Sequence, residues 1–412
     1  MSQRPFRDLV VFARGGGWGS DNPLDDHDQV SIIRGTDFGS VRTGRVDAVP
    51  RRWEKRSKLA QRVLRPGDVV LEISGGSAAR GQTTGRTLFI GEEVLSYFAG
   101  AVIPASFCRV VRFDITLVEP QYAYYGLQDM YYSGRASAYE NQSTGISNFQ
   151  FERFLDAELL RVPPLAEQRR IVTLLSAIDG KIAVNGRIAE CSLALADAHF
   201  SDAVEGVSTG PETFGSIAQV GGGGTPSTKV PEYWDGNIAW ATPSDVTALG
   251  APYLFGTSRR ITDAGFDNCA SALYPAGSIF MTSRATIGAF AIPQIPMAVN
   301  QGFIVVVTPD EELMMWLLHE MRDRVDEMRS LANGSTFLEL SRKNFKAMGV
   351  RLPTPTARKE FAGKAIPLHQ VAAAATAEST TLIKLRDTLL PELMSGRLRV
   401  RDAEKVVEEA VR

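Results

Sequence analysis

Three short segments hold residue types that could act on a phosphate or on a nucleic acid. The segment GGGGTPSTK at residues 221–229 resembles a phosphate-binding loop, but no lysine directly follows its glycines. Asp179 and Lys181 bring a carboxylate and an ammonium group together, yet Mg²⁺-dependent nuclease chemistry needs clustered carboxylates. Pro163-Pro164 lacks the flanking polar and aromatic residues of an amino-methyltransferase motif. The sequence therefore predicts a chain without a catalytic centre.

The histidines and cysteines show no metal-binding pattern. The four histidines are scattered, and Cys108, Cys191 and Cys269 form no C-x-x-C pair, which argues against a zinc site or a disulfide framework. No apolar run reaches the roughly 20 residues that span a bilayer, and the first residues lack a secretory h-region. We therefore expect a cytoplasmic protein without a metal site. Its composition, 44% hydrophobic and 22% charged, is that of a globular protein, and 412 residues suffice for two or three domains.

One stretch of the chain is strongly basic, although the net charge is only −2. Between residues 42 and 65 the acidic residues are Asp47 and Glu54, against nine lysines and arginines. Phosphate contacts from such residues supply much of the affinity of proteins for duplex DNA. The stretch is therefore a candidate contact to the DNA backbone, and its alternative interpretation is an ordinary solvated face. The candidate residues are Arg42, Arg45, Arg51, Arg52, Lys55, Arg56 and Lys58.

The chain repeats itself. A glycine triplet precedes IIRGTD at residues 32–37 in the first copy and IAWATPSD at residues 238–245 in the second. LRPGDVV at 64–70 resembles LYPAGSIF at 273–280, and the match closes with Phe149 against Phe345 and a proline pair in each copy. The first copy is longer in its middle, and we expect the extra residues around 74–86. Two diverged copies of one unit therefore make up the protein.

Each copy changes character along its length. Its first part has short β-like runs bounded by glycine and proline, such as residues 69–73 and 303–307, which predict a mixed sheet with loops. Its last part has apolar residues alternately three and four apart, which predicts a coiled-coil seam. The predicted fold is α+β, with two mixed α/β domains separated by a long antiparallel two-helix coiled coil; the alternative is two core helices of separate domains. The seam residues are Ile171, Leu175, Ile178, Ile182 and Asn185 in one helix, and Leu368, Val371, Leu382, Leu385 and Leu389 in the other.

Five segments, taken together and in order, resemble a known family. They are PPLAEQRRIVTLLSAIDGKI at 163–182, GGTPSTKVPEYWDGNIAWATPSDV at 223–246, SRATIGAFAI at 283–292, AVNQGF at 298–303 and LRDTLLPELMSGRL at 385–398. With these segments the chain resembles the specificity subunits of type I restriction-modification enzymes over nearly its whole length. The first copy lacks a clear counterpart of PEYWDG and of NQGF.

The resemblance implies a subunit that reads a split, asymmetric DNA site with one target-recognition domain for each half. The domains would be residues 1–160 and 206–350, with spacer helices at 161–205 and 351–412. The partners would be double-stranded DNA, two modification (methyltransferase) subunits docked on the helices, and restriction/translocase subunits. The chain itself would hold no cofactor, since S-adenosylmethionine, ATP and Mg²⁺ would be bound in the partners. Two alternatives remain, a coiled-coil adaptor of another DNA-defence complex and an unrecognised enzyme.

Side chains that can bind base edges stand at similar places in the two copies. Arg34 and Thr36 are the candidate readers of the first copy, and Trp240, Thr242 and Ser244 hold the matching places in the second. Arg284, Asn300 and Gln301 add groups suited to guanine or adenine, although Asn300 and Gln301 would equally suit a braced turn. Four further residues are expected to contact phosphates: Ser335, Thr336, Arg342 and Lys343.

Overall fold

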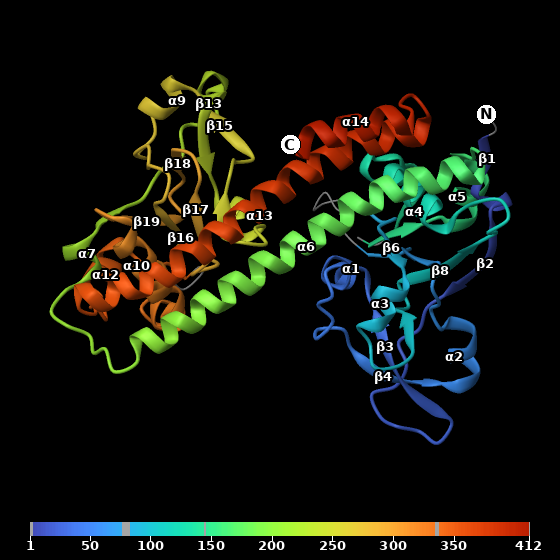
Figure 1. Ribbon diagram of the computed structural model, residues 1–412, viewed down its shortest axis with the longest axis horizontal. Coiled ribbons are helices and arrows are strands. Elements are labelled where there is room, and N and C mark those ends of the chain that lie inside the picture. The colour runs from blue at the N-terminus through green and yellow to red at the C-terminus, as the bar shows by residue number, and fades with distance from the viewer. Residues whose placement is uncertain (1–2, 76–82, 144–145, 334–337, 412) are drawn as a thin grey trace. The chain divides into compact units, whose positions relative to one another are not determined.

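The computed structural model describes residues 3–75, 83–143, 146–333 and 338–411. These residues form two compact units. Unit 1 comprises residues 1–183 and 380–412, and unit 2 comprises residues 184–379. Each of the two long helices, α6 (Leu165–Val204) and α13 (Pro355–Ser395), therefore belongs partly to one unit and partly to the other (Figure 1).

Unit 1 contains two main sheets. An antiparallel sheet has the strand order β2-β8-β5-β6, and a smaller sheet has the order β4-β3-β7, in which β3 and β7 run parallel. Two short antiparallel pairs, β1-β11 and β9-β10, complete the strands. The strands are β1 (Gln3–Pro5), β2 (Val10–Gly15), β3 (His27–Ile33), β4 (Arg51–Lys55), β5 (Asp68–Glu72), β6 (Thr87–Ile90), β7 (Val102–Pro104), β8 (Cys108–Phe113), β9 (Glu140–Ser143), β10 (Ile146–Phe149) and β11 (Leu159–Arg161).

The helices of unit 1 cover these sheets, and the core forms between them. Tyr122, Leu127 and Met130 of α4 (Pro120–Tyr132) pack in the same buried cluster as Val69 and Leu71 of β5. The remaining helices are short except for the last: η1 (Phe6–Asp8), η2 (Gly35–Asp37), α1 (Phe38–Arg42), α2 (Arg56–Arg62), α3 (Glu92–Ser96), η4 (Arg135–Tyr139), α5 (Phe151–Ala157) and α14 (Val400–Val411).

Unit 2 repeats this topology. Its larger sheet has the order β12-β19-β16-β17-β14, and its smaller sheet has the order β15-β13-β18, with β13 and β18 parallel. Only β14 has no counterpart among the described strands of unit 1. The strands are β12 (Gln219–Gly221), β13 (Trp234–Ala241), β14 (Tyr253–Leu254), β15 (Arg259–Ile261), β16 (Ile279–Thr282), β17 (Phe290–Pro293), β18 (Met297–Val299) and β19 (Phe303–Val307).

The helices of unit 2 also follow the pattern of unit 1. Phe214 of α7 stacks on Phe345 of α12 with 4.6 Å between ring centroids, as Phe6 packs on Phe154 of α5 at 4.9 Å. The predicted repeat is thus confirmed, but its pairing of Phe149 with Phe345 is wrong, because Phe154 holds that place. The helices are α7 (Phe214–Ile217), η5 (Pro231–Tyr233), α8 (Pro243–Thr247), α9 (Asp263–Asp267), α10 (Glu311–Asp323), α11 (Val325–Ser330) and α12 (Arg342–Ala347).

Both glycine triplets contain a position at which only glycine fits, and the steric reason is the same in the two units. A Cβ atom at Gly16 would overlap the carbonyl oxygen of Pro104 at the end of β7, and one at Gly223 would overlap that of Val299 at the end of β18. The next residue in each unit is bonded to the same oxygen, since Gly17 N–H donates to Pro104 O and Gly224 N–H to Val299 O, at 2.9 and 3.1 Å. Glycine is required because the backbone approaches another backbone too closely for a side chain.

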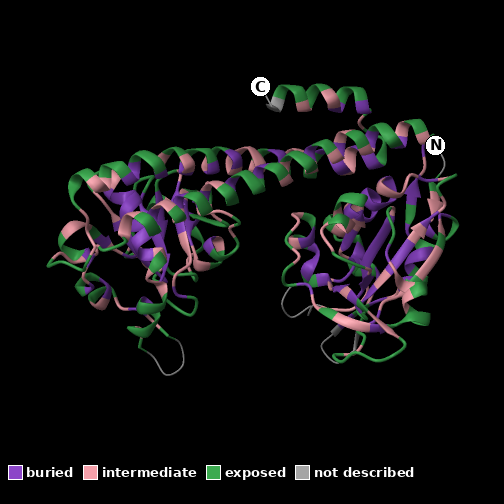
Figure 2. Cartoon of the chain, turned by 60° about the horizontal axis from the view of Figure 1, so that its bottom comes forward, coloured by how far each residue is buried: buried purple, intermediate pink, exposed green. Residues whose placement is uncertain are grey.

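The long helices pack on each other in both units. In unit 1, Ile171, Leu175 and Ile178 of α6 share a buried cluster with Leu382 and Leu389 of α13, and Ile182 and Leu385 lie at its margin. In unit 2, Ala189 and Ala196 of α6 share a cluster with Ala365 and Ala372, and Leu368 packs against it. The Asn185 amide, 1% exposed, donates to Glu378 Oε2 at 2.8 Å. Figure 2 shows the alternation of buried and exposed residues along these helices.

One predicted seam residue is wrong. Val371 is 49% exposed, whereas the adjacent Ala372 is fully buried. The stripe that faces α6 passes through Ala365, Ala372 and Leu382, so the real seam runs one residue later at this point. Val371 was predicted in the seam because it is apolar, but the residues that lie where the two helices approach closely are small alanines.

Among the described residues, no helix is both long and apolar enough to cross a membrane.

Candidate nucleic-acid interface

The predicted reader residues gather at one edge of each unit. Strands β3 and β7 run parallel, so their carboxyl ends meet at one edge, and the chain beyond Glu72 of β5 reaches the same edge. Such edges are the usual place of binding sites in sheets with parallel strands. We call this the recognition edge. It comprises Arg34, Thr36, Ser74, Ala105 and Ser106 in unit 1, and Thr242, Ser244, Arg284, Asn300 and Gln301 in unit 2.

The strand register makes these two sets equivalent, residue by residue. Ile33 pairs with Pro104, and Ala241 pairs with Val299. Ala105 N–H donates to Ile33 O at 2.9 Å, and Asn300 N–H donates to Ala241 O at 3.0 Å. Thr242 therefore stands where Arg34 stands, Ser244 matches Thr36, and Gln301 matches Ser106. The missing counterpart of NQGF in the first copy is the segment ASFC at residues 105–108, which sequence comparison did not reveal because its side chains differ.

A carboxylate holds the backbone at the start of each edge. Asp37 Oδ2 accepts from the Arg34 backbone N–H at 2.9 Å, and Asp245 Oδ2 accepts from the Thr242 N–H at 2.8 Å. Arg34 also binds Asp37 with its guanidinium, which raises the pKa of Arg34. Burial opposes ionisation of Asp245, but hydrogen bonds from Thr242 and Ser258 outweigh it and lower the pKa of Asp245. In both units an aspartate side chain therefore fixes the backbone at the start of the edge.

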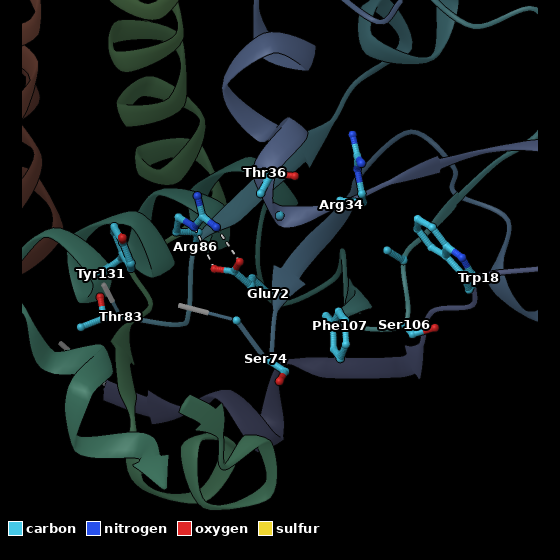
Figure 3. A pocket seen from close by; sticks show the side chains of 13 residues that line it. Trp18, Arg34, Thr36, Glu72, Ser74, Thr83, Arg86, Ser106, Phe107 and Tyr131 are labelled. Atoms are coloured by element: carbon cyan, nitrogen blue, oxygen red, sulfur yellow. Dashed lines mark hydrogen bonds and ion pairs between the residues drawn. The ribbon is translucent and has the colours of Figure 1, made fainter. Parts of the chain in front are cut away.

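In unit 1 the recognition edge opens into a pocket of about 710 Å³ (Figure 3). Arg34 and Thr36 line it together with residues that no sequence signal had singled out, among them Trp18, Glu72, Arg86, Ser106 and Phe107. The Arg86 guanidinium donates to both Glu72 oxygens, at 2.8 and 2.6 Å, and these bonds raise the pKa of Arg86. A pocket that combines aromatic faces with paired charges suits a ligand with flat faces and polar edges.

In unit 2 the edge carries different side chains. Gln301 is exposed, and its Oε1 accepts from the Thr225 hydroxyl at 2.6 Å. Arg284 is 44% exposed and pairs with Glu339 at 2.8 Å. Asn300 Oδ1 accepts from the Gly302 N–H at 2.8 Å, so this side chain braces the turn, as the alternative interpretation held. Gln301, Ser244 and Arg284 thus present the polar surface of this edge.

Trp240 is a correction to the predicted site. Its side chain is only 2% exposed and packs on Trp234 with ring centroids 5.2 Å apart, while its indole N–H donates to Gly224 O at 3.1 Å. The register aligns Trp240 with Ile32, a core residue, rather than with Arg34. A side chain this deeply buried packs the small sheet and presents nothing to a base.

Three cations of the basic stretch of unit 1 are neutralised by acids at residues 21–28, in the loop before β3 and at the start of β3. Arg52 pairs with Asp21, Lys55 with Asp26 at 3.1 Å, and Arg56 with Asp28 at 3.0 Å. Lys55 also lowers the pKa of Asp26. The loop before β3 and the first residues of β3 therefore place an acid beside three of the five central cations.

The remaining predicted phosphate contacts have varied surroundings. Arg51 donates to Gln29 Oε1 at 2.7 Å, Arg45 donates to Thr43, and Arg42 donates to the Thr87 carbonyl. Lys58 is exposed and forms no ion pair with the part of the chain that the structure describes. Arg342 and Lys343 are exposed at the start of α12, whereas Ser335 and Thr336 lie outside the described residues. Within the described ranges, no cluster of three histidines, cysteines or acids could hold a metal ion.

Comparisons with known proteins agree with this architecture. Residues 212–364 match the family model described as the type I restriction modification DNA specificity domain. The type I restriction enzyme MjaIX specificity subunit of Methanocaldococcus jannaschii is 34% identical over 148 residues, which are 35% of this chain and 34% of that protein. The EcoR124I/EcoR124II specificity subunit of Escherichia coli is 25% identical over 154 residues, 36% of this chain and 37% of that protein.

A solved structure shares the fold over almost its full length. The type I restriction-modification S subunit from M. genitalium superposes with a TM-score of 0.59 at 15% identity, covering 95% of this chain and 96% of that one. The match to the curated relatives spans about a third of their length. The chain therefore consists of two repeated α/β units, and each unit contains packed segments of both α6 and α13. Over residues 212–364 the chain is similar to the DNA specificity domain of type I restriction-modification enzymes.

Proposed function

We propose that the chain is the DNA-specificity subunit of a type I restriction-modification complex, and that each recognition edge reads one half of a bipartite, asymmetric DNA site. One observation carries the proposal. The two units place different polar side chains on the same backbone frame, Arg34 against Thr242 and Ser106 against Gln301. A repeated frame with unlike readers suits a site whose halves have different sequences.

In this proposal the chain performs no chemistry itself. Its partners are double-stranded DNA, two methyltransferase subunits docked on the long helices, and restriction/translocase subunits. S-adenosylmethionine, ATP and Mg²⁺ would be bound by these partners, in the cytoplasm where the chromosome lies. The neutralised basic stretch fits this division of labour, since paired cations contribute less phosphate affinity and the methyltransferase subunits would supply more of it.

Expression of the chain with its methyltransferase subunits in a host free of adenine methylation tests the proposal. Single-molecule sequencing of the host genome should show methylated adenines within one bipartite motif. Exchange of residues 1–160 for the corresponding domain of another specificity subunit should change one half of that motif and leave the other half intact. An assembled complex that methylates no defined motif would overturn the proposal in favour of the adaptor alternative. Methylation by the purified chain alone would show that it is an enzyme.

A further inference from the structure

The pocket of unit 1 displays aromatic side chains that a folded domain ordinarily covers. Phe107 is 64% exposed and Trp18 is 41% exposed, although large apolar residues are usually buried. The backbone at Phe107 is held in place, because its carbonyl accepts from the N–H groups of Ile73 and Ser74 at 2.9 and 3.3 Å. Arg52 lies over the Trp18 ring at 4.8 Å. Phe107 is therefore an exposed stacking surface on a fixed backbone, beside a Trp18 ring that Arg52 covers on one face.

The charges in the pocket are already paired. Arg86 is bound by Glu72, which is 4% exposed (Figure 3). Arg34 is bound by Asp37, which is 5% exposed. A phosphate would have to displace a carboxylate from one of these cations. A neutral ring with donors and acceptors on its edge would not, and it could bind the hydroxyl groups of Thr36 and Ser106. The pocket chemistry therefore favours a neutral, flat, polar-edged ligand.

The size of the pocket agrees with such a ligand. Its 710 Å³ falls within the roughly 300–1,000 Å³ of small-molecule sites. It opens at the recognition edge, where DNA is expected. A base stacked within a duplex cannot enter a pocket, so a base that reaches these residues must first leave the stack.

We propose that this pocket holds one nucleobase that is turned out of the duplex in the half-site read by unit 1. The proposal rests on the DNA-recognition function proposed above. Phe107 stacks on the face of the base, and Thr36, Ser106 and the Glu72–Arg86 pair surround its edge. This base is distinct from the adenine that a methyltransferase subunit would turn out for its own chemistry.

Unit 2 lacks the same features at the equivalent positions. Glu72 N–H donates to Arg86 O, and Thr282 N–H donates to Ala289 O, both at 2.9 Å, so threonine and alanine replace the ion pair. Ile73 N–H donates to Phe107 O, and Ser283 N–H donates to Gly302 O, so glycine replaces the aromatic ring. The extruded base is therefore expected in one half-site only.

Fluorescent base analogues test this proposal in the complete complex. The motif is first identified by methylome sequencing, and 2-aminopurine or pyrrolocytosine is then placed at each position of both half-sites. Fluorescence should rise on binding at the methylated adenines and at one further position in the half-site of unit 1. Phe107→Ala should abolish only that further signal and weaken binding by about 5- to 150-fold, the range expected for one lost base–aromatic stack.

Two control variants separate stacking from general damage. Phe107→Trp should keep the further signal, because it retains a flat ring. Ile115→Ala removes a 70% exposed apolar side chain that does not line the pocket, and it should leave signal and affinity unchanged. Tight binding of the motif without any further signal, or a signal that survives Phe107→Ala, would overturn this inference while leaving the proposed function standing. If the wild-type complex selects no motif, the proposed function itself is wrong.

Discussion

Arg34 and Thr242 occupy the same place in the two units, at the carboxyl end of a parallel strand pair and three residues before an aspartate that binds their backbone N–H. The backbone geometry is repeated, whereas the side chains are a guanidinium and a hydroxyl group. Half-site preference can thus change without any change in the backbone geometry.

Gln301→Ala should relax specificity at one base pair of the half-site read by unit 2. Loss of a good side-chain contact to a base edge costs about 1–3 kcal/mol of discrimination. Methylome sequencing should then show more than one base at that position. Ser106→Ala is the matched change in unit 1, and any effect should appear in the other half only. Relaxation of both halves by either variant would contradict independent reading by the two units.

Removal of the two acids Asp26 and Asp28, which lie just before and within β3, should strengthen DNA binding. In Asp26→Asn and Asp28→Asn, Lys55 and Arg56 lose their carboxylate partners and become available to phosphates. Affinity for random duplex DNA should rise, and the slope of log affinity against log salt should steepen by about 0.9 for each additional phosphate that is neutralised. Lys58→Ala should flatten the slope by a similar amount if Lys58 binds a phosphate. Slopes unchanged in all three variants would show that this stretch is an ordinary solvated face.

The corrected helix seam predicts opposite results for neighbouring residues. Val371→Ala should change the free energy of unfolding by less than about 0.5 kcal/mol, because the side chain is exposed. Ala372→Leu should lower it by about 1–3 kcal/mol, because the larger side chain does not fit between α6 and α13. Chemical denaturation monitored by circular dichroism measures both. A larger loss of stability in Val371→Ala than in Ala372→Leu would show that Val371, and not Ala372, lies in the contact between the helices.

Unit 2 should lose stability as the pH falls below about 6.5. His319 Nε2 and His369 Nε2 lie 3.0 Å apart, and the chain of contacts continues to Asp197 and to Tyr253. Burial lowers the pKa of His319; burial, followed by the nearby His319 and Arg322, lowers the pKa of His369 to about 3. Below about pH 6.5 these histidines bind protons in the unfolded chain but stay neutral in the folded one. Their contribution to the free energy of unfolding is therefore complete above that pH and declines below it.

The size of this effect can be measured by denaturation between about pH 8 and about pH 5, a range that spans the ordinary pKa of histidine. Each fully shifted histidine should remove up to about 1.4 kcal/mol per pH unit below its unfolded value. The variant His319→Gln/His369→Gln should show a flatter dependence over this range, and Asp197 does not interfere because its pKa is lowered from an already acidic value. An equally steep loss in the variant would assign the effect to other groups.

Much of the fold followed from the sequence alone. The glycine triplets, the proline pairs and the 3,4 spacing from Ile171 to Asn185 were sufficient to predict a repeated α/β unit and paired helices. These signals are local, because each depends on the conformation or the periodicity of one backbone segment. The extra residues of the first copy were only partly located: they are divided between the β5–β6 connection, which includes residues outside the described ranges, and the segment that contains α3.

Only the tertiary structure decided which side chains share a surface. The sequence paired Trp240 with the reader position, whereas strand register places it in the core beside Trp234. Phe107 and Glu72 carried no signal, because a lone phenylalanine or glutamate near a strand end is ordinary in any sequence. The acids just before β3 and at its start neutralise cations much further along the chain, a pairing made by the β3–β4 register. Periodicity determines what one element buries, but contacts between distant elements depend on how strands align, and that information is not local.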